Sequence, residues 1–234
     1  MTAIVRLRLA AYVRAYHAVA PLIAALVVLG TLYGGGVSRP EEAYGVSAIV
    51  MFPVLAWQAK ILLDVEPDVQ RRLVRVAAGT ASREISAGLL AAAATGVPTI
   101  LLALGLPWLV GGVGDAVYLK GQPAPLSLGA ALAVGIWTHL LVVGPAVALG
   151  AWASRPVSRT IGGAVSVLTA GSVLAIVVGL SFSPVPWAAP PLMAVARATS
   201  DGLSAGQVLG MTGWALAWAG VAIAGYWRLR LRRI

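Results

Sequence analysis

Cysteine is absent from the 234 residues of this chain, which excludes disulfides, thiolate metal sites and cysteine nucleophiles. Charge is scarce as well: only 11% of the residues are charged, whereas about a quarter are charged in a typical soluble domain. A soluble fold needs polar residues to cover its surface, and 59% of this chain is hydrophobic. The lipid bilayer is therefore the expected solvent of the folded chain.

Motifs for metal and nucleotide chemistry are missing too. The two histidines, His17 and His139, form no H-x-x-x-H or H-E-x-x-H pair, so we expect no metal site. A Walker A loop ends in Gly-Lys followed by Ser or Thr, and neither Lys60 nor Lys120 is followed by such a residue. We therefore predict no catalytic residue and no cofactor in this chain.

Six runs of mostly apolar residues are long enough to cross a bilayer, which requires about 20 residues in a helix. We therefore expect an all-α integral membrane protein with one transmembrane domain over residues 1–234. The six expected spans cover roughly residues 17–35, 43–63, 86–110, 126–152, 160–182 and 207–227.

The basic residues are distributed unevenly between these spans. If the N-terminus is cytoplasmic, all 17 basic residues except Arg39, Lys120 and Arg197 fall on the inner side. This asymmetry follows the positive-inside rule and explains the net charge of +9, so nucleic acid is not an expected partner. Arginine outnumbers lysine, and alanine and glycine are abundant, as in GC-rich bacterial genomes. We predict a multi-pass protein of a bacterial plasma membrane with both termini in the cytoplasm.

Residues 1–16 place Arg6, Arg8 and Arg14 among apolar side chains. A basic amphipathic helix of this kind lies on the anionic inner leaflet, so we expect an interfacial helix that contacts membrane lipids. The alternative is that these arginines only set the topology.

The segment 64–85, DVEPDVQRRLVRVAAGTASREI, holds the densest charge in the chain and would lie on the cytoplasmic side after the second span. Pro67 suits the first turn of a helix, Asp68 favours its N-terminus, and Gly79 is placed to end it. The apolar residues of this helix share one face: Val69, Leu73 and Val76. We predict a short amphipathic helix that docks a cytoplasmic partner. The alternative is a solvated connector whose apolar face rests on lipid or on the bundle.

The segment 183–206, on the outer side, is rich in proline but apolar in its middle. Such a segment can dip into the membrane if protein shields its backbone. A re-entrant hairpin and a plain surface loop both remain open for it.

Together these features resemble the permease subunit of ABC-2-type transporters, a family that includes bacterial exporters of drugs, polysaccharides and antibiotics. The resemblance covers the whole chain. It rests on the basic N-terminal segment, the six spans, the charged helix after the second span, and the long outer segment before the sixth. The stretch RRLVRVAAGTASREISAGLL is similar to the family's region between the second and third spans.

The resemblance implies that the helix in 64–85 is a coupling helix seated in a cleft of a separate ATPase subunit, which would bind ATP and Mg²⁺. Residues 1–15 would form an elbow helix near that subunit. Six spans are half of such a transporter, so a second permease copy or a paralogue is expected as a dimer partner. The residues expected at the ATPase contact are Asp68, Val69, Arg71, Arg72, Leu73 and Arg75, flanked by Glu66 and Glu84.

Small residues at four-residue spacing let helices approach closely in lipid. They occur in two spans that meet across the dimer in this family, at Gly30 and Gly34 and at Gly171, Ala175 and Gly179. The cargo would be hydrophobic or amphipathic: a drug, an antibiotic, a peptide or a lipid-like molecule. Candidates for an apolar cargo path, for which core packing is the alternative, are Met51, Phe52, Trp57, Trp214 and Trp218.

A six-span protein that is not driven by ATP, either a secondary transporter or a membrane scaffold or immunity protein, is the competing class. A proton-coupled carrier needs buried carboxylates, whereas all 8 acidic residues are expected in or beside loops. Glu41 and Glu42 are interpreted as part of a solvated outer loop. His139 in the fourth span is expected to hydrogen-bond a neighbouring helix.

Overall fold

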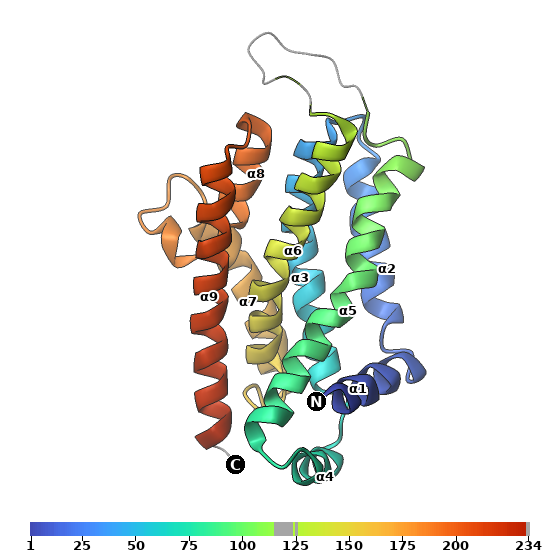
Figure 1. The fold of residues 1–234 in the computed structure, drawn as a ribbon, viewed down its shortest axis with the longest axis vertical. Coiled ribbons are helices and arrows are strands. Elements are labelled where there is room, and N and C mark those ends of the chain that lie inside the picture. The colour runs from blue at the N-terminus through green and yellow to red at the C-terminus, as the bar shows by residue number, and fades with distance from the viewer. Residues whose placement is uncertain (115–123, 125, 233–234) are drawn as a thin grey trace.

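The computed structural model describes residues 1–114, 124 and 126–232. The described residues form an all-α bundle whose long helices run side by side (Figure 1). Lys120 lies outside the described residues. The helices are α1 (Thr2–Arg14), α2 (Val19–Tyr33), α3 (Pro40–Leu63), α4 (Asp68–Ala78), α5 (Ala81–Leu109), α6 (Leu128–Ala153), α7 (Ile161–Val178), the 3₁₀ turn η1 (Pro186–Ala188), α8 (Leu192–Asp201) and α9 (Ala205–Arg232).

Five of these helices, α3, α5, α6, α7 and α9, are long and apolar enough to cross a membrane. A sixth span exists only if α1 and α2 count as one broken span, because they meet at a bend of 73°. The chain turns there through Tyr16, whose φ of 56° is left-handed. The prediction of an all-α membrane protein is confirmed, with five to six spans. The 15 residues of α2 rise about 22 Å, less than the roughly 30 Å of a bilayer core.

Local capping explains where three of the long helices begin. The side chains of Thr80, Ser127 and Thr160 each accept a hydrogen bond from a backbone N–H in the first turn of α5, α6 and α7. At the other end, α7 stops at Val178, four residues before the predicted span ended. With only 18 residues, it is the shortest of the five candidate spans.

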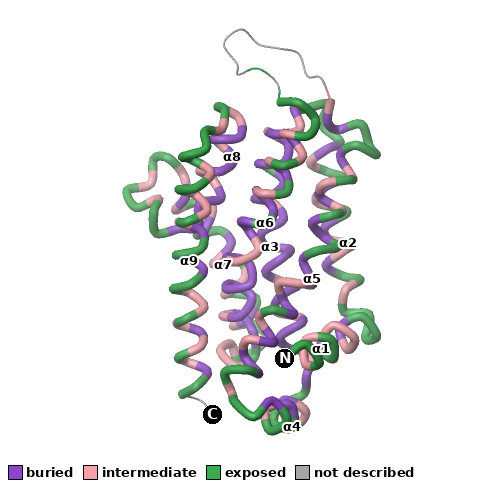
Figure 2. The backbone as a smooth tube through the Cα atoms, viewed as in Figure 1, coloured by how far each residue is buried: buried purple, intermediate pink, exposed green. Residues whose placement is uncertain are grey.

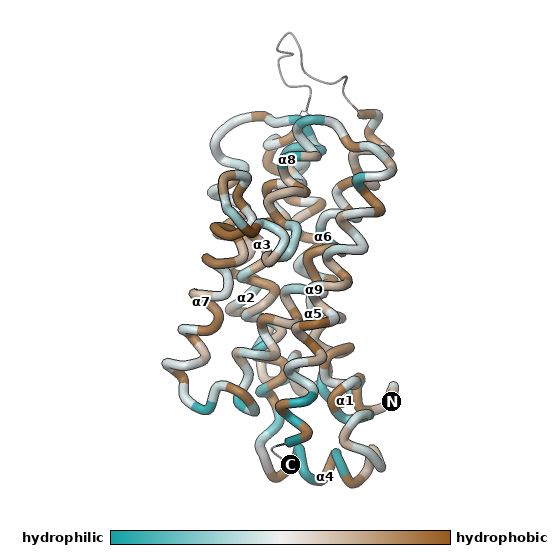
Figure 3. Tube along the Cα trace, turned by 90° about the vertical axis from the view of Figure 1, so that its left-hand side faces the viewer, coloured by the Kyte–Doolittle hydropathy of each residue, from teal (hydrophilic) through white to brown (hydrophobic). Residues whose placement is uncertain are grey.

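The two ends of the bundle differ in charge. One end, called here the α4 end, carries α1, α4 and both chain termini; the opposite end carries α8 and is called the α8 end (Figure 1). All described basic residues except Arg39 and Arg197 belong to segments at or near the α4 end. Hydrophilic segments gather at both ends, whereas the middle of the bundle is largely apolar (Figure 3).

Helix α3 is the centre of the bundle and packs most extensively against α6. In the apolar 18-residue stretch of α3, 61% of the residues are buried. In the corresponding stretch of α9, at the periphery, 11% are buried, and Figure 2 shows the same contrast. Two glycines of α6 permit the close approach. A Cβ at Gly150 would lie 2.4 Å from the carbonyl oxygen of Ala56, and one at Gly135 would lie 2.6 Å from the ring of Tyr44.

One polar side chain inside the bundle, that of His139, lies between two helices. His139 is fully buried; its Nδ1 lies 2.8 Å from the carbonyl oxygen of Gly135 and its Nε2 lies 3.2 Å from Ser47 Oγ on α3. Because a carbonyl can only accept, the proton sits on Nδ1, and Nε2 is left as an acceptor beside Ser47 Oγ, whose hydroxyl also donates to the carbonyl oxygen of Tyr44 at 3.2 Å. His139 therefore lies at a polar contact between α3 and α6, which fits the interhelical role expected for it.

Candidate functional site

The charged segment folds as the sequence predicts. Helix α4 begins at Asp68 after Pro67 and ends at Gly79, which adopts the left-handed φ of 77° that favours glycine. Figure 1 shows α4 beyond the ends of the long helices, lying across the axis of the bundle. The side chain of Asp68 lies outside what the structure describes. Because α4 lies across the end of the bundle, one side of this helix faces the bundle and the other side faces away from it.

The apolar face of α4 points away from the bundle. Val69, Leu73 and Val76 are exposed by 71%, 66% and 81%, and Arg72 beside them is also exposed. Val74 and Ala78, together with Arg71, cover the bundle side instead. These four exposed residues, Val69, Arg72, Leu73 and Val76, are called here the α4 outer face. The bundle does not cover this face, so of the two resting places in the connector alternative, lipid and the bundle, the bundle is not the one observed.

Arg71 fastens α4 to the helix before it. Its guanidinium is 7% exposed and donates to the carbonyl oxygens of Leu63 at 3.1 Å and Glu66 at 3.4 Å. These carbonyls follow the last turn of α3, where backbone acceptors lack helical partners. Arg71 therefore lies inside this chain rather than on the surface expected to contact an ATPase. Arg75 is half-buried and only partly available to a partner.

Four charged side chains from separate segments form a buried cluster next to α4, called here the buried ion network: Arg8, Glu66, Glu84 and Arg230. Glu84 is fully buried and accepts from both arginines, with Arg230 Nη2 2.7 Å from its Oε2. Arg8 Nη2 also lies 2.7 Å from Glu66 Oε2. The two negative charges balance the two positive charges, as burial of ions requires.

The buried ion network joins four parts of the chain. Arg8 comes from α1, Glu66 from the link between α3 and α4, Glu84 from the first turn of α5, and Arg230 from the last turn of α9. Gly88, one turn after Glu84, leaves space for the Arg8 guanidinium, because a Cβ at Gly88 would lie 2.2 Å from Arg8 Nη1. Glu66 precedes α4 in the sequence and Glu84 follows it. A displacement of α4 would therefore displace the two carboxylates of the buried ion network.

Glu66 and Glu84 therefore differ from the sequence-based expectation. Both were expected to flank the contact with an ATPase, but they are 3% and 0% exposed and are bound by arginines of this chain. The described acidic residues do lie in or beside loops, as expected, but a place beside a loop does not make them exposed. Asp64 is also buried, pairing with Lys60 at 3.1 Å and accepting from the backbone N–H of Arg155 at 2.8 Å.

The outer segment after α7 lies alongside α9 rather than beyond its end. The indole N–H groups of Trp214 and Trp218 donate to the carbonyl oxygens of Trp187 at 3.2 Å and Ala188 at 2.8 Å. Trp218 stands thirteen residues into α9, which corresponds to about 20 Å along its axis. Since α9 is a candidate span, η1 lies level with its interior, as a re-entrant segment would.

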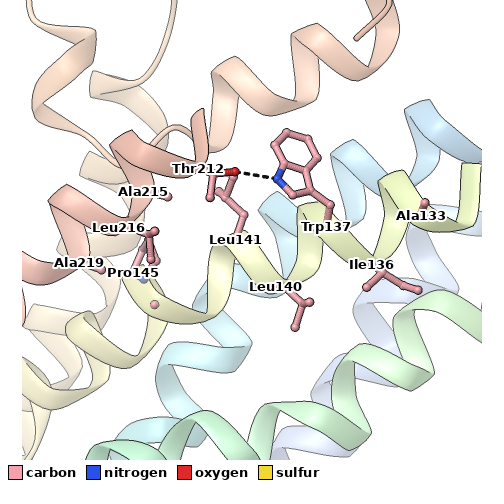
Figure 4. Close-up of a pocket in the computed structure, with 11 residues that line it drawn as sticks. Ala133, Ile136, Trp137, Leu140, Leu141, Pro145, Thr212, Ala215, Leu216 and Ala219 are labelled. Carbon is pink, nitrogen blue, oxygen red and sulfur yellow. Dashed lines mark hydrogen bonds between the residues drawn. The ribbon is translucent and has the colours of Figure 1, made fainter. Parts of the chain in front are cut away.

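Two apolar cavities flank α9. One cavity, of about 650 Å³, is lined by Phe52 and Trp218 together with Trp152 and residues 188–190. The other, of about 480 Å³, lies between α6 and α9, where Trp137 Nε1 donates to Thr212 Oγ1 at 2.9 Å (Figure 4). Of the residues expected along a cargo path, Phe52 and Trp218 thus line a cavity.

The other candidates for the cargo path are placed differently. Met51 is buried in the core of the bundle, which is the packing alternative. Trp57 is half-buried on α3, and Trp214 holds the outer segment. The sequence identifies aromatic residues in two of the spans that line the cavity of about 650 Å³, α3 and α9, but it does not reveal which of these residues face the cavity.

The small residues expected at a dimer interface separate into two groups. A Cβ at Gly171 would lie 2.4 Å from Leu149 Cδ1, Ala175 is buried, and Gly179 is buried close to Met193. This face of α7 contacts α6 and α8 within the chain, and Gly171 and Ala175 also line the cavity of about 650 Å³. Their place at a dimer interface stays a prediction. Gly30 and Gly34 on α2 are exposed and remain candidates.

Comparisons of the chain with models of known families, with curated proteins and with solved structures find no match.

Proposed function

We propose that this chain is the permease subunit of an ATP-driven exporter of the ABC-2 type, which moves a hydrophobic or amphipathic cargo out of a bacterial cell. A separate ATPase subunit binds ATP and Mg²⁺ and docks on the α4 end, which lies in the cytoplasm together with both chain termini. A second permease, identical or paralogous, completes the transporter.

The observation that carries this proposal is the α4 outer face. A helix at a membrane surface normally turns its apolar side to lipid or to its own bundle, because exposed apolar area is unfavourable in water. In α4 the apolar side lies opposite the bundle and beyond the ends of the spans. Three adjacent aliphatic side chains with an arginine at their edge match a helix that inserts into a groove of a partner.

The buried ion network supplies a route from this docking helix to the spans. Arg71 fixes α4 to the end of α3, and Glu66 and Glu84 connect both ends of α4 to α1 and α9. Buried ion pairs tolerate little change in geometry, since a separated charge loses its compensation. A push on α4 by a closing ATPase therefore moves α1, α5 and α9 together rather than bending the loop alone.

The two cavities beside α9 support an apolar cargo. Their linings are almost entirely aliphatic and aromatic, and both lie at the level of the spans. Volumes of about 480 and 650 Å³ fall in the range of small-molecule sites, roughly 300–1,000 Å³. Helix α9, which lines both cavities, is the least buried of the five candidate spans.

The proposal is tested by purifying the chain from its native membrane in mild detergent and identifying what accompanies it. The informative variant is Leu73→Asp, which places a charge in the centre of the α4 outer face. The matched control is Ile161→Asp, because Ile161 is 87% exposed at the same end of the bundle but belongs to α7. Both substitutions affect exposed residues, so both proteins should fold and remain in the membrane.

We expect an ATPase subunit to co-purify with the wild type and with Ile161→Asp, and to be reduced at least tenfold with Leu73→Asp. Absence of any ATPase from the wild-type preparation would reject ATP-driven export. A cation-coupled carrier is the second candidate function, and one observation favours it: Glu41, expected in a solvated loop, is only 4% exposed. That class would then take first place.

A further inference from the structure

A cavity of about 310 Å³ lies at the α8 end, away from the features considered so far. Its described lining comes from the start of α3, from residues 124 and 126, from the end of α8 and from the turn between α8 and α9. Five of the nine described lining residues are polar or charged, unlike those of the cavities beside α9, although most of the lining surface is apolar. The residues are Arg39, Glu41, Ala124, Leu126, Thr199, Ser200, Gly202, Leu203 and Ser204.

Glu41 is the unusual member of this lining. Its side chain is buried, and its Oε1 lies 3.8 Å from Arg39 Nε. Its Oε2 is buried and has no hydrogen-bond partner among the residues that the structure describes. Arg39 is engaged elsewhere, with Glu42 and with the carbonyl oxygen of Ser200 at 3.3 Å. An ionised carboxylate oxygen that is buried without a donor is strongly unfavourable, so this position calls for a donor group.

The hydroxyl groups of the cavity do not provide that donor. Thr199 and Ser200 both donate to the carbonyl oxygen of Ala196, at 2.8 and 3.2 Å, and Ser204 Oγ donates to Gln207 Oε1 at 2.9 Å. Each hydroxyl has one hydrogen, so only lone pairs remain to face the cavity. Apart from Arg39, whose guanidinium is engaged with Glu42 and Ser200, the polar side chains that line the cavity present acceptors.

The charges beside the cavity also favour a ligand that donates hydrogen bonds. Among the described residues, Arg39 contributes one positive charge, whereas Glu41 and Glu42 contribute two negative charges, which leaves these three residues with a net charge of about −1 when the carboxylates are ionised. An anion is disfavoured by this balance. A cation that carries N–H donors satisfies both the charge and the unpartnered oxygen.

We propose that this cavity binds a protonated amine, with the ammonium group donating to Glu41 Oε2. An ammonium has three donors and no acceptor, which complements an acceptor-lined cavity. The volume lies at the low end of ligand sites, so it accommodates a head group rather than a large drug. The source is a free amine or the head group of an aminophospholipid in the adjacent leaflet. The assignment does not depend on ATP-driven export and is tested without an ATPase.

The experiment measures the thermal unfolding of the purified full-length protein in detergent with ethylammonium chloride, and with tetramethylammonium chloride as a probe that has the charge but no N–H. The test variant is Glu41→Gln. The matched control is Asp201→Asn, which removes an exposed carboxylate at the same end of the bundle. Nanodiscs of phosphatidylethanolamine are compared with nanodiscs of phosphatidylcholine, whose head group also lacks N–H.

We expect ethylammonium at about ten times its Kd to raise Tm by about 4 °C in the wild type and in Asp201→Asn, and to have no effect on Glu41→Gln. Tetramethylammonium should have no effect on any of them. Greater stability in phosphatidylethanolamine than in phosphatidylcholine would assign the amine to a lipid, and equal stability would assign it to a free ligand.

Three results would overturn the proposal: no response of the wild type to ethylammonium or to phosphatidylethanolamine, an equal response of Glu41→Gln, or an equal response to tetramethylammonium. If Glu41→Gln does not fold, the comparison of the two probes on the wild type decides the question.

Discussion

The buried ion network predicts that Glu84 carries an unusually large share of the stability of this chain. The substitution Glu84→Gln keeps the size of the side chain but removes the negative charge that binds both Arg8 and Arg230. Glu84 is fully buried, and the two arginines are 3% and 5% exposed, so water cannot replace the lost partner. Removing one member of a buried ion pair destabilises a protein by about 3–5 kcal/mol.

We expect the low end of that range, about 3 kcal/mol, because each arginine keeps at least one other hydrogen bond. Arg8 retains Glu66, and Arg230 retains the hydroxyl of Tyr226 at 2.9 Å. For a domain of this size, that loss corresponds to a fall in Tm of roughly 6–12 °C, measured by thermal unfolding in detergent. The exposed-site variant Asp201→Asn should unfold with the wild type.

A double variant makes the test specific to the ion pair. In Glu84→Gln/Arg230→Gln, the buried positive charge is removed together with its partner, so less charge is left uncompensated. The two single substitutions should therefore be non-additive, with a coupling of about 1–3 kcal/mol. Additive effects, or a Glu84→Gln protein that unfolds within about 2 °C of the wild type, would refute the reasoning.

Two further predictions concern the packing and the sidedness of the bundle. Gly150→Ala should sharply reduce the yield of folded protein, because its Cβ would lie 2.4 Å from the carbonyl oxygen of Ala56, whereas Gly206→Ala has open space around it and should leave the yield in size-exclusion chromatography unchanged. The chain has no cysteine, so single exposed cysteines report topology directly: in intact cells a membrane-impermeant maleimide should label Ser204→Cys but not Ser82→Cys, and the reverse pattern would contradict the proposed orientation.

Local pattern was enough for the class of the protein and for the ends of α4. Hydropathy over about 20 residues depends only on neighbouring residues, so the apolar runs indicated a membrane protein without any knowledge of contacts. The limits of α4 were likewise set by Pro67 before it and Gly79 after it. The shared face of Val69, Leu73 and Val76 followed from helical periodicity alone.

The direction of that face and the partners of the charges were decided by the tertiary structure. Periodicity shows which residues share a face but not whether the face turns toward the bundle, and α4 turns it away. Glu84 meets Arg8 and Arg230 across 76 and 146 residues of sequence, so no local pattern identifies the pairing. Glu41 is a buried carboxylate that shares a cavity with the end of α8 and the α8–α9 turn, which lie about 160 residues away in the sequence. Charge in a sequence suggests solvent, and only the arrangement of the helices brings buried partners together, because ion pairing acts through space and not along the chain.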